Sequence, residues 1–270
     1  MPKFDVVFIH VPRVFRPTTT PLRRVLGKLK SPTIEEYIEY PLIAMGIFGL
    51  ASSVSGAGYK TKIFNLALEQ QINSSFSLQR FLKSIQSKIY CISLNWFVHS
   101  PGAIQFASTC KKLYPNSLVV LGGMTASWFS KEIITNHPEI DLIVRGEADE
   151  NFLDALEKCF SEKSLDTVRG ITYRSSSGVK ETPLGKPPSD IDKIDYTNLE
   201  LLENWKKYLK SGATGFRKEN PPTFWLPIAR GCTYNCIHCG GGREAYKMWS
   251  GRDEITFRSP SRIIEDIELL

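Results

Sequence analysis

The first 160 residues alternate between short β-branched segments and longer amphipathic segments, and this alternation constrains the fold more than any other feature. The short segments are apolar over most of their length, as strands buried on both faces are. Strands that alternate with helices predict a doubly wound parallel sheet of the α/β class, because right-handed crossovers place helices on both faces. The expected strands span 4–11, 60–67, 89–95, 117–123 and 141–147, and the expected helices 42–57, 76–88, 101–113, 128–136 and 150–160.

The carboxyl ends of these strands carry residues typical of a binding edge. In a doubly wound sheet, ligands bind beyond the carboxyl ends of the strands. The third strand continues into "SLNWFVHSPG", the fourth into "GGMTAS" and the fifth into "RGEADE". Gly122 and Gly123 lack a Cβ and would let a ligand approach the backbone closely; a tight turn is the alternative interpretation. We therefore expect a ligand site at this edge.

The chain changes character after residue 165. The segment "TVRGITYRSSSGVKETP" predicts a small hairpin, and "LGKPPSDIDKIDYTNLELLENW" is polar and proline-rich like a domain linker. Residues 221–230 are apolar and predict a strand that leads to Cys232, whereas "RSPSRIIEDIELL" predicts a helix with a Ser-Pro start. We expect a first domain over 1–165, a hairpin and linker over 166–222, and the start of a second domain over 223–270.

Charge and hydropathy exclude few functions. The formal net charge is +6, and residues 13–30 contain Arg13, Arg16, Arg23, Arg24, Lys28 and Lys30 without an acid. A solvated loop is the ordinary interpretation of such a run and an anionic ligand or partner is the alternative, so nucleic acid is not the expected partner.

The N-terminus lacks the features of a signal peptide, and the longest apolar stretch is interrupted and short for a bilayer. The cytoplasm is the expected compartment, with no membrane partner.

Half of the six cysteines lie within eight residues of "ARGCTYNCIHCGGG", at Cys232, Cys236 and Cys239. Thiols stay reduced in the cytoplasm, so grouped cysteines there more often bind a metal than form a disulfide. A structural zinc site needs four ligands, and the fourth would have to be His238 or a distant group. An iron–sulfur cluster normally takes four cysteines, so three would leave one iron open for another ligand. We favour the cluster and keep zinc as the alternative.

The segment "LPIARGCTYNCIHCG" resembles the opening of a radical S-adenosylmethionine (SAM) domain. The resemblance implies a [4Fe-4S] cluster on Cys232, Cys236 and Cys239, with SAM on the open iron and 5′-deoxyadenosyl radical chemistry. It also implies an external electron donor of the flavodoxin or ferredoxin type. The family usually has Tyr or Phe before the last cysteine, near the adenine, where this chain has His238.

Residues 41–157 are similar in pattern to the cobalamin (B12)-binding domain that precedes many radical SAM domains. The resemblance implies that the strand ends line a slot for the nucleotide tail of cobalamin. The D-x-H-x-x-G motif that supplies a lower cobalt ligand in corrinoid methyltransferases is absent, and His10 is expected to be a strand-end or core histidine. The implied tail contacts are Ser93, Gly122, Gly123 and Met124, together with Gly146 and Glu147.

The combined expectation is an α/β chain: a flavodoxin-like (Rossmann-like) doubly wound sheet, a linker hairpin and the first βα unit of a radical SAM barrel. Its function would be that of the N-terminal portion of a cobalamin-dependent radical SAM enzyme, acting in methyl transfer or rearrangement of a substrate that the sequence does not identify. Because it stops early in the expected barrel, we expect no turnover by this chain alone. The alternatives are a non-catalytic corrinoid- or nucleotide-binding module and a zinc-stabilised interaction protein. The other cysteines are expected to be packing residues: Cys91, Cys110 and Cys159.

Overall fold

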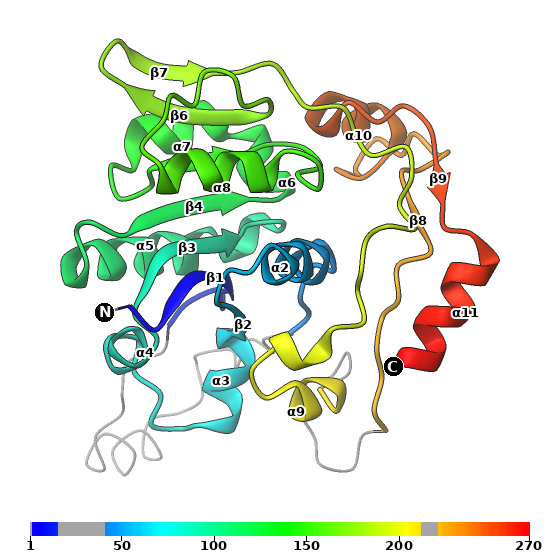
Figure 1. The fold of residues 1–270 in the computed structure, drawn as a ribbon, viewed down its shortest axis with the longest axis horizontal. Coiled ribbons are helices and arrows are strands. Elements are labelled where there is room, and N and C mark those ends of the chain that lie inside the picture. Colours follow the sequence, from blue (N-terminus) through cyan, green and yellow to red (C-terminus); the bar gives the residue numbers. More distant parts are fainter. Residues whose placement is uncertain (1, 16–40, 212–220) are drawn as a thin grey trace.

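The computed structural model describes residues 2–15, 41–211 and 221–270, which form a large sheet flanked by helices and a C-terminal segment beside it (Figure 1). The strands are β1 (Phe4–His10), β2 (Thr61–Asn65), β3 (Ser87–Ser93), β4 (Leu118–Gly122), β5 (Leu142–Val144), β6 (Ile171–Ser175), β7 (Gly178–Glu181), β8 (Ala229–Arg230) and β9 (Thr256–Phe257). The helices are α2 (Gly46–Gly56), α3 (Leu66–Ile72), α4 (Leu78–Ser84), α5 (Ser100–Leu113), α6 (Met124–Trp128), α7 (Ser130–Asn136), α8 (Phe152–Phe160), α9 (Trp205–Leu209), α10 (Arg243–Ser250) and α11 (Pro260–Leu269), with short 3-10 turns at Phe97–His99 and Leu199–Leu201.

The large sheet has the strand order β2-β1-β3-β4-β5-β6-β7, and its first five strands are parallel. The order 2-1-3-4-5 is that of flavodoxin-like sheets. The chain reverses direction across the sheet between β1 and β3, which is the point where such folds bind their ligands. The expected flavodoxin-like, doubly wound α/β fold is therefore confirmed.

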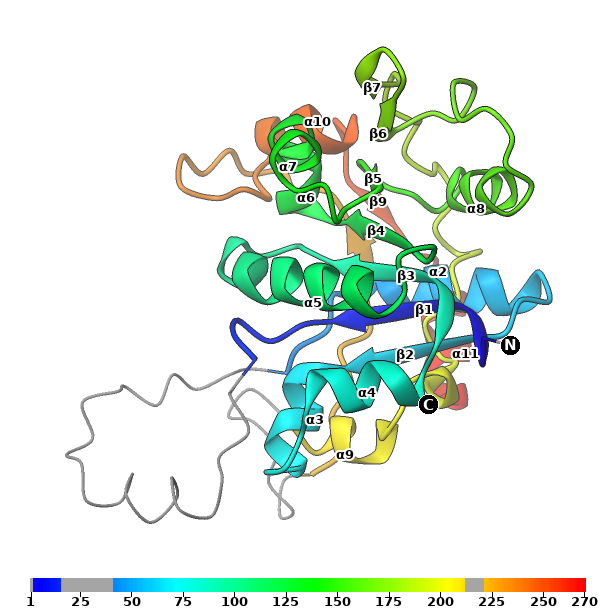
Figure 2. The same cartoon turned by 90° about the vertical axis from the view of Figure 1, so that its left-hand side faces the viewer.

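Two apolar clusters, one on each face of the sheet, explain why the strands are apolar throughout. Alternate residues of β1 point to opposite faces: Phe8 joins the cluster with α2 and α8, whereas Ile9 joins the cluster with α4 and α5. Figure 2 shows α4 and α5 on the near side of the strands. The expected packing roles of Cys91 and Cys110 are confirmed, because both are buried, and Cys159 is half-buried. No helix among the described residues has the length and hydropathy needed to cross a membrane.

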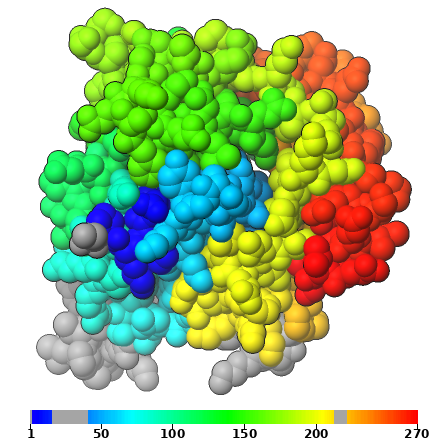
Figure 3. Space-filling view, viewed as in Figure 1, coloured from blue at the N-terminus to red at the C-terminus, as the bar shows by residue number. Residues whose placement is uncertain are grey.

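Parts of residues 166–222, the expected hairpin and linker, pack against the large sheet and α2. The expected hairpin is present as β6 and β7, and it extends the large sheet because β6 pairs antiparallel with β5. Ile194 and Tyr196 of the polar stretch are buried in the α2 cluster. A Cβ on Gly49 of α2 would lie 2.4 Å from Ile194, so glycine permits this close approach. Figure 3 shows the stretch, in yellow, between α2 and the C-terminal residues.

The C-terminal segment differs in detail from the expectation. The expected strand over 221–230 is regular only at β8, which pairs antiparallel with β9. The helix α11 is confirmed; its N-cap Ser259 accepts a hydrogen bond from the backbone N–H of Arg262, and Pro260 is in the first turn. Helices α3, α6, α9 and α10 were not expected. Most of the basic segment 13–30 lies outside the described residues.

Candidate functional site

A cavity of about 300 Å³ opens at the carboxyl ends of β1, β3, β4 and β5, on the face covered by α2. Its interior is largely apolar, with Phe8, Val120 and Phe152 among the lining residues. Such a lining, with few polar groups, is typical of small-molecule and cofactor sites. Most of the residues implied by the resemblance come together in this wall: Ser93, Gly122, Gly123, Gly146 and Glu147.

The ends of β3 and β4 are joined by Asn95, which the sequence analysis did not single out. Its side-chain amide donates a hydrogen bond to Ser93 Oγ at 2.8 Å, and its carbonyl oxygen accepts one from the backbone N–H of Met124 at 3.2 Å. Gly123 has a φ of +104°, and a Cβ there would lie 2.9 Å from the Asn95 side chain. Glycine is therefore required at 123 by both conformation and space.

Ser93 and Gly122 face the cavity under different constraints. Ser93 Oγ accepts the bond from Asn95, and a hydroxyl in that role keeps its own hydrogen to donate. A Cβ on Gly122 would have the Val144 carbonyl oxygen as its nearest heavy atom, at 3.6 Å, which is an ordinary contact. The surrounding protein therefore leaves room for a side chain at position 122. Such a side chain would occupy part of the cavity.

Gly146 lies between the cavity and α10. Its φ is +75°, and a Cβ there would lie 3.4 Å from Ser250 Cα and 3.5 Å from the Trp249 carbonyl oxygen. Its amide donates a hydrogen bond to Ser127 Oγ at 3.0 Å. The residue that we expected to contact a ligand therefore also lets the last turn of α10 pack against the strand ends.

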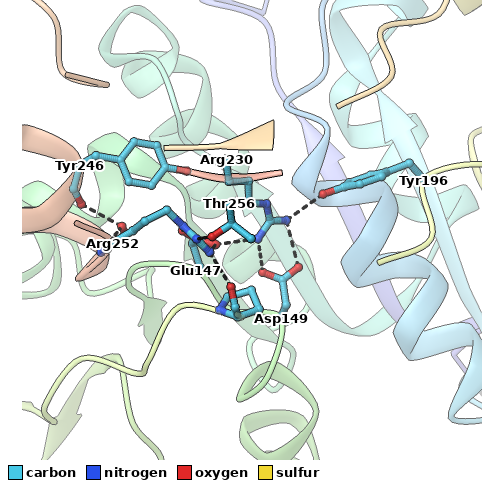
Figure 4. Close-up of polar contacts among 9 residues, drawn as sticks. Glu147, Asp149, Tyr196, Arg230, Tyr246, Arg252 and Thr256 are labelled. Carbon is cyan, nitrogen blue, oxygen red and sulfur yellow. Dashed lines mark hydrogen bonds and ion pairs between the residues drawn. The ribbon is translucent and has the colours of Figure 1, made fainter. Parts of the chain in front are cut away.

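Glu147 is buried and paired with two arginines of the C-terminal segment (Figure 4). Arg252 binds it through Nε to Oε1 at 2.5 Å and Nη2 to Oε2 at 2.9 Å, and Arg230 Nη1 donates to Oε2 at 2.9 Å. Arg230 also makes a two-point contact with Asp149 at 2.6 and 3.1 Å, and its Nη2 donates to Tyr196 Oη at 3.0 Å. Glu147 was expected to contact a ligand, and its arginine partners were not expected.

The charged side chains of this network are largely buried and neutralise one another. Burial on its own would lower the pKa of Arg230, but the hydrogen bonds and charge of Asp149 prevail and raise that pKa further above its ordinary range. Burial raises the pKa of the Tyr196 hydroxyl. Two carboxylates and two guanidiniums satisfy one another here, which buried charges require.

The C-terminal segment supplies the remaining wall of the cavity through Pro227, Arg230, Tyr246 and Trp249. The rings of Tyr246 and Trp249, both from α10, lie with their centroids 4.6 Å apart. Burial raises the pKa of Tyr246 to about 12, so its hydroxyl is neutral at physiological pH. The cavity is therefore built from both the sheet and the segment that carries the cysteines.

The three cysteines lie on an exposed turn next to this wall. The N–H of Cys239 donates to the carbonyl of Cys236 at 3.1 Å, and the N–H of Gly242 donates to that of Cys239 at 3.1 Å. Cys236 and Cys239 are exposed and Cys232 is half-buried. Among the described residues, no group of three or more His, Cys, Asp or Glu side chains is arranged to hold a metal ion. The chemistry of three thiols on one short turn nevertheless suits an iron–sulfur cluster.

Two further predicted contacts lie on or near the turn. His238 is exposed, between two of the cysteines, and does not line the cavity. Met124 also lies outside the cavity lining, and its sulfur is 3.1 Å from the position that a Cβ on Gly240 would take. Met124 thus marks a contact between the sheet edge and the cysteine turn.

His10 is fully buried and does not line the cavity, which agrees with its interpretation as a core histidine. Its ring lies 5.0 Å from that of His99 and 6.3 Å from that of Trp96. No described residue gives either of its ring nitrogens a hydrogen bond. Burial, reinforced by the nearby His99, lowers the pKa of His10 to about 3, so the ring is neutral.

Comparison with known proteins reveals distant relatives. No model of a known protein family matches the chain. It is 27% identical over 241 residues to the hopanoid C-3 methylase of Methylococcus capsulatus, covering 88% of this chain and 42% of that protein. It is 26% identical over 225 residues to the anaerobic magnesium-protoporphyrin IX monomethyl ester cyclase of Rubrivivax gelatinosus, covering 82% of this chain and 38% of that protein.

The fold also matches solved structures. The cobalamin-dependent S-adenosylmethionine radical enzyme OxsB, with aqua-cobalamin and S-adenosylmethionine bound, superposes with a TM-score of 0.65 at 16% identity. The match covers 98% of this chain and 31% of that one. Together these similarities confirm the resemblance to B12-binding and radical SAM proteins. The chain spans about two fifths of the length of the curated relatives described above.

Proposed function

We propose that this chain is the cofactor-holding portion of a cobalamin-dependent radical SAM enzyme. The observation that carries the proposal is the composite cavity, which is walled by the strand ends on one side and by residues flanking the cysteine turn on the other. Residues 1–165 would form the cobalamin-binding domain, 166–222 the hairpin and connection, and 223–270 the start of the radical SAM domain. The sequence similarity to a methylase and a cyclase supports this kind of enzyme.

The residues around the cavity suit the tail of cobalamin. The apolar wall would receive its flat base, the Ser93 hydroxyl would donate a hydrogen bond to a polar atom, and Gly122 would leave room for close approach. Glu147 and Asp149 are already paired with arginines, so they would act by holding the wall in place. Bound cobalamin supplies a cobalt centre that can carry a methyl group.

The cysteine turn would hold the second cofactor. Cys232, Cys236 and Cys239 provide the thiolates, and a bound [4Fe-4S] cluster supplies the electron for reductive cleavage of SAM at an iron without a protein ligand. His238 would lie near the adenine of SAM. The reaction class that we favour is methyl transfer to a poorly activated carbon, with rearrangement as the alternative, and a reduced flavodoxin- or ferredoxin-type protein of the cytoplasm as electron donor.

Anaerobic reconstitution with iron and sulfide tests the cluster assignment. We expect about four irons per chain and, after dithionite reduction, an EPR signal that changes when SAM is added. Cys236→Ala should lose most of the iron because only two thiolates remain. Cys159→Ala, which removes a half-buried thiol away from the turn, is the matched control and should keep it.

The outcomes separate the alternatives. Stoichiometric zinc without a [4Fe-4S] signal would overturn the proposal in favour of a zinc-stabilised protein. Cobalamin binding without any cluster would instead favour the non-catalytic corrinoid module.

A further inference from the structure

The cysteine turn belongs to a loop whose two ends are both anchored to the same short segment after β5. The loop, residues 231–251, begins directly after Arg230 and ends directly before Arg252. Both arginines bind Glu147, and Arg230 also binds Asp149, two residues further along the segment that follows β5 (Figure 4). Two distant points of the chain are thereby held side by side at the base of the loop.

Each of the two arginines makes a two-point contact with a carboxylate. Arg252 forms two parallel bonds with Glu147, and Arg230 forms two with Asp149. Two-point guanidinium–carboxylate contacts define orientation as well as distance, which a lysine ammonium cannot do. Arg252 also donates from Nη2 to the Pro188 carbonyl at 2.7 Å, and its side chain is 4% exposed. The network therefore has the rigidity that a positioning device needs.

The same segment faces the cavity. Residues 146–149 and Arg230 all contribute to the cavity wall. The last turn of α10, within the loop, packs on the Gly146 backbone, and Tyr246 and Trp249 of that helix line the cavity. A ligand in the cavity would therefore contact the anchoring segment and the anchored loop together.

We propose that Arg230 and Arg252 are positioning residues that hold the base of the cysteine loop against the cavity through Glu147 and Asp149. The inference rests on the proposed function for what the loop carries, but the anchoring itself concerns only this chain. A consequence is reciprocal coupling: cobalamin in the cavity restricts the loop, and a restricted loop strengthens cobalamin binding.

Hydrogen–deuterium exchange of the ligand-free protein tests the anchoring. Arg230→Lys keeps the charge but loses the two-point contact, so exchange within residues 231–251 should become about tenfold faster, the effect of losing one charged hydrogen bond. Exchange in β1, β3 and β4 should stay within twofold, which distinguishes a positioning role from a general loss of stability. Unchanged exchange in residues 231–251 would overturn the proposal.

Arg145→Lys is the matched control. The Arg145 side chain is 12% exposed, compared with 13% for Arg230, and it pairs with Glu181 and donates to the carbonyl oxygens of Ile171 and Thr182. The same substitution there should leave the exchange of residues 231–251 unchanged. Equally faster exchange of residues 231–251 in both variants would show that the loop responds to the loss of any buried arginine. That result would contradict the proposal.

Cyanocobalamin, which does not require a free thiol or a cluster, tests the coupling. In the wild-type chain it should slow exchange in residues 231–251 about fivefold, and Arg230→Lys should lose this protection and bind about fivefold more weakly. Binding that protects the loop equally in both proteins would overturn the coupling. If the wild-type chain does not bind cyanocobalamin, the proposed cobalamin function fails, while the ligand-free comparison still decides the anchoring.

Discussion

Gly122→Val should bind cobalamin about a hundredfold more weakly than the wild-type chain, because valine adds three carbon atoms and overfilling a packed site costs about 1–3 kcal/mol. Gly122 lines the cavity, and the nearest heavy atom to a new Cβ would be the Val144 carbonyl oxygen at an ordinary 3.6 Å. Valine also suits a strand position. The added volume therefore falls on the ligand and not on the protein core. Isothermal titration with cyanocobalamin measures the change in dissociation constant.

The control adds the same side chain where no cavity exists. Gly56 closes α2, has no heavy atom within 4 Å of a Cβ position and does not line the cavity. Gly56→Val should bind cyanocobalamin like the wild-type chain. A Gly122→Val protein that folds, with a melting temperature near that of the wild type, and still binds with unchanged affinity would show that this cavity is not the tail site.

His10 should make the protein sensitive to acid. The ring has a pKa of about 3 when folded and an ordinary value of 6.5 when unfolded, so between these values the unfolded chain binds one more proton than the folded chain. Stability must then fall as the pH falls through this window, by up to about 1.4 kcal/mol per pH unit. From pH 6.5 to 4.5 the contribution of His10 is a loss of about 2 kcal/mol. Below pH 3 the loss stops growing.

Urea unfolding of the His10→Leu variant isolates the contribution of His10 to the pH dependence of stability. Carboxylates titrate in both proteins, so the difference between their free energies of unfolding at the two pH values belongs to His10. We expect the variant to lose about 2 kcal/mol less than the wild type on acidification. Identical losses for His10→Leu and the wild type would contradict the burial of a neutral His10.

The core of the fold was predictable because its signals are local. The apolar segments of β1, β3 and β4 identify buried strands, and connections long enough for helices imply parallel pairing. Helix α3 was missed because the apolar residues of β2 continue into it, and the side-chain cap of Asn65 that divides strand from helix is visible only in three dimensions. The polar stretch around Tyr196 was expected to act as a linker, since its apolar residues follow no regular period.

The candidate site, too, was predictable only where its signals are local in the sequence. Ser93, Gly122 and Gly123 could be identified because strand-end residues of a parallel sheet always meet at one edge. Asn95 could have been suspected from its place two residues after the strand. The pairing of Arg230 with Glu147 and Asp149 could not be predicted. The partners are 83 and 81 residues apart in the sequence, and an arginine near a cysteine loop can bind many other groups.

The sequence by itself determined the doubly wound parallel sheet, the edge at which ligands are expected and the grouping of three thiols on which the proposed cofactor chemistry rests. These follow from periodicity, crossover handedness and residue chemistry, which act over short distances along the chain. Only the tertiary structure decided that Glu147 holds the cysteine segment, that Gly146 accommodates α10 and that one cavity has walls from both segments. Those contacts depend on the positions of side chains distant in sequence, and buried charges choose partners by geometry that no local pattern records.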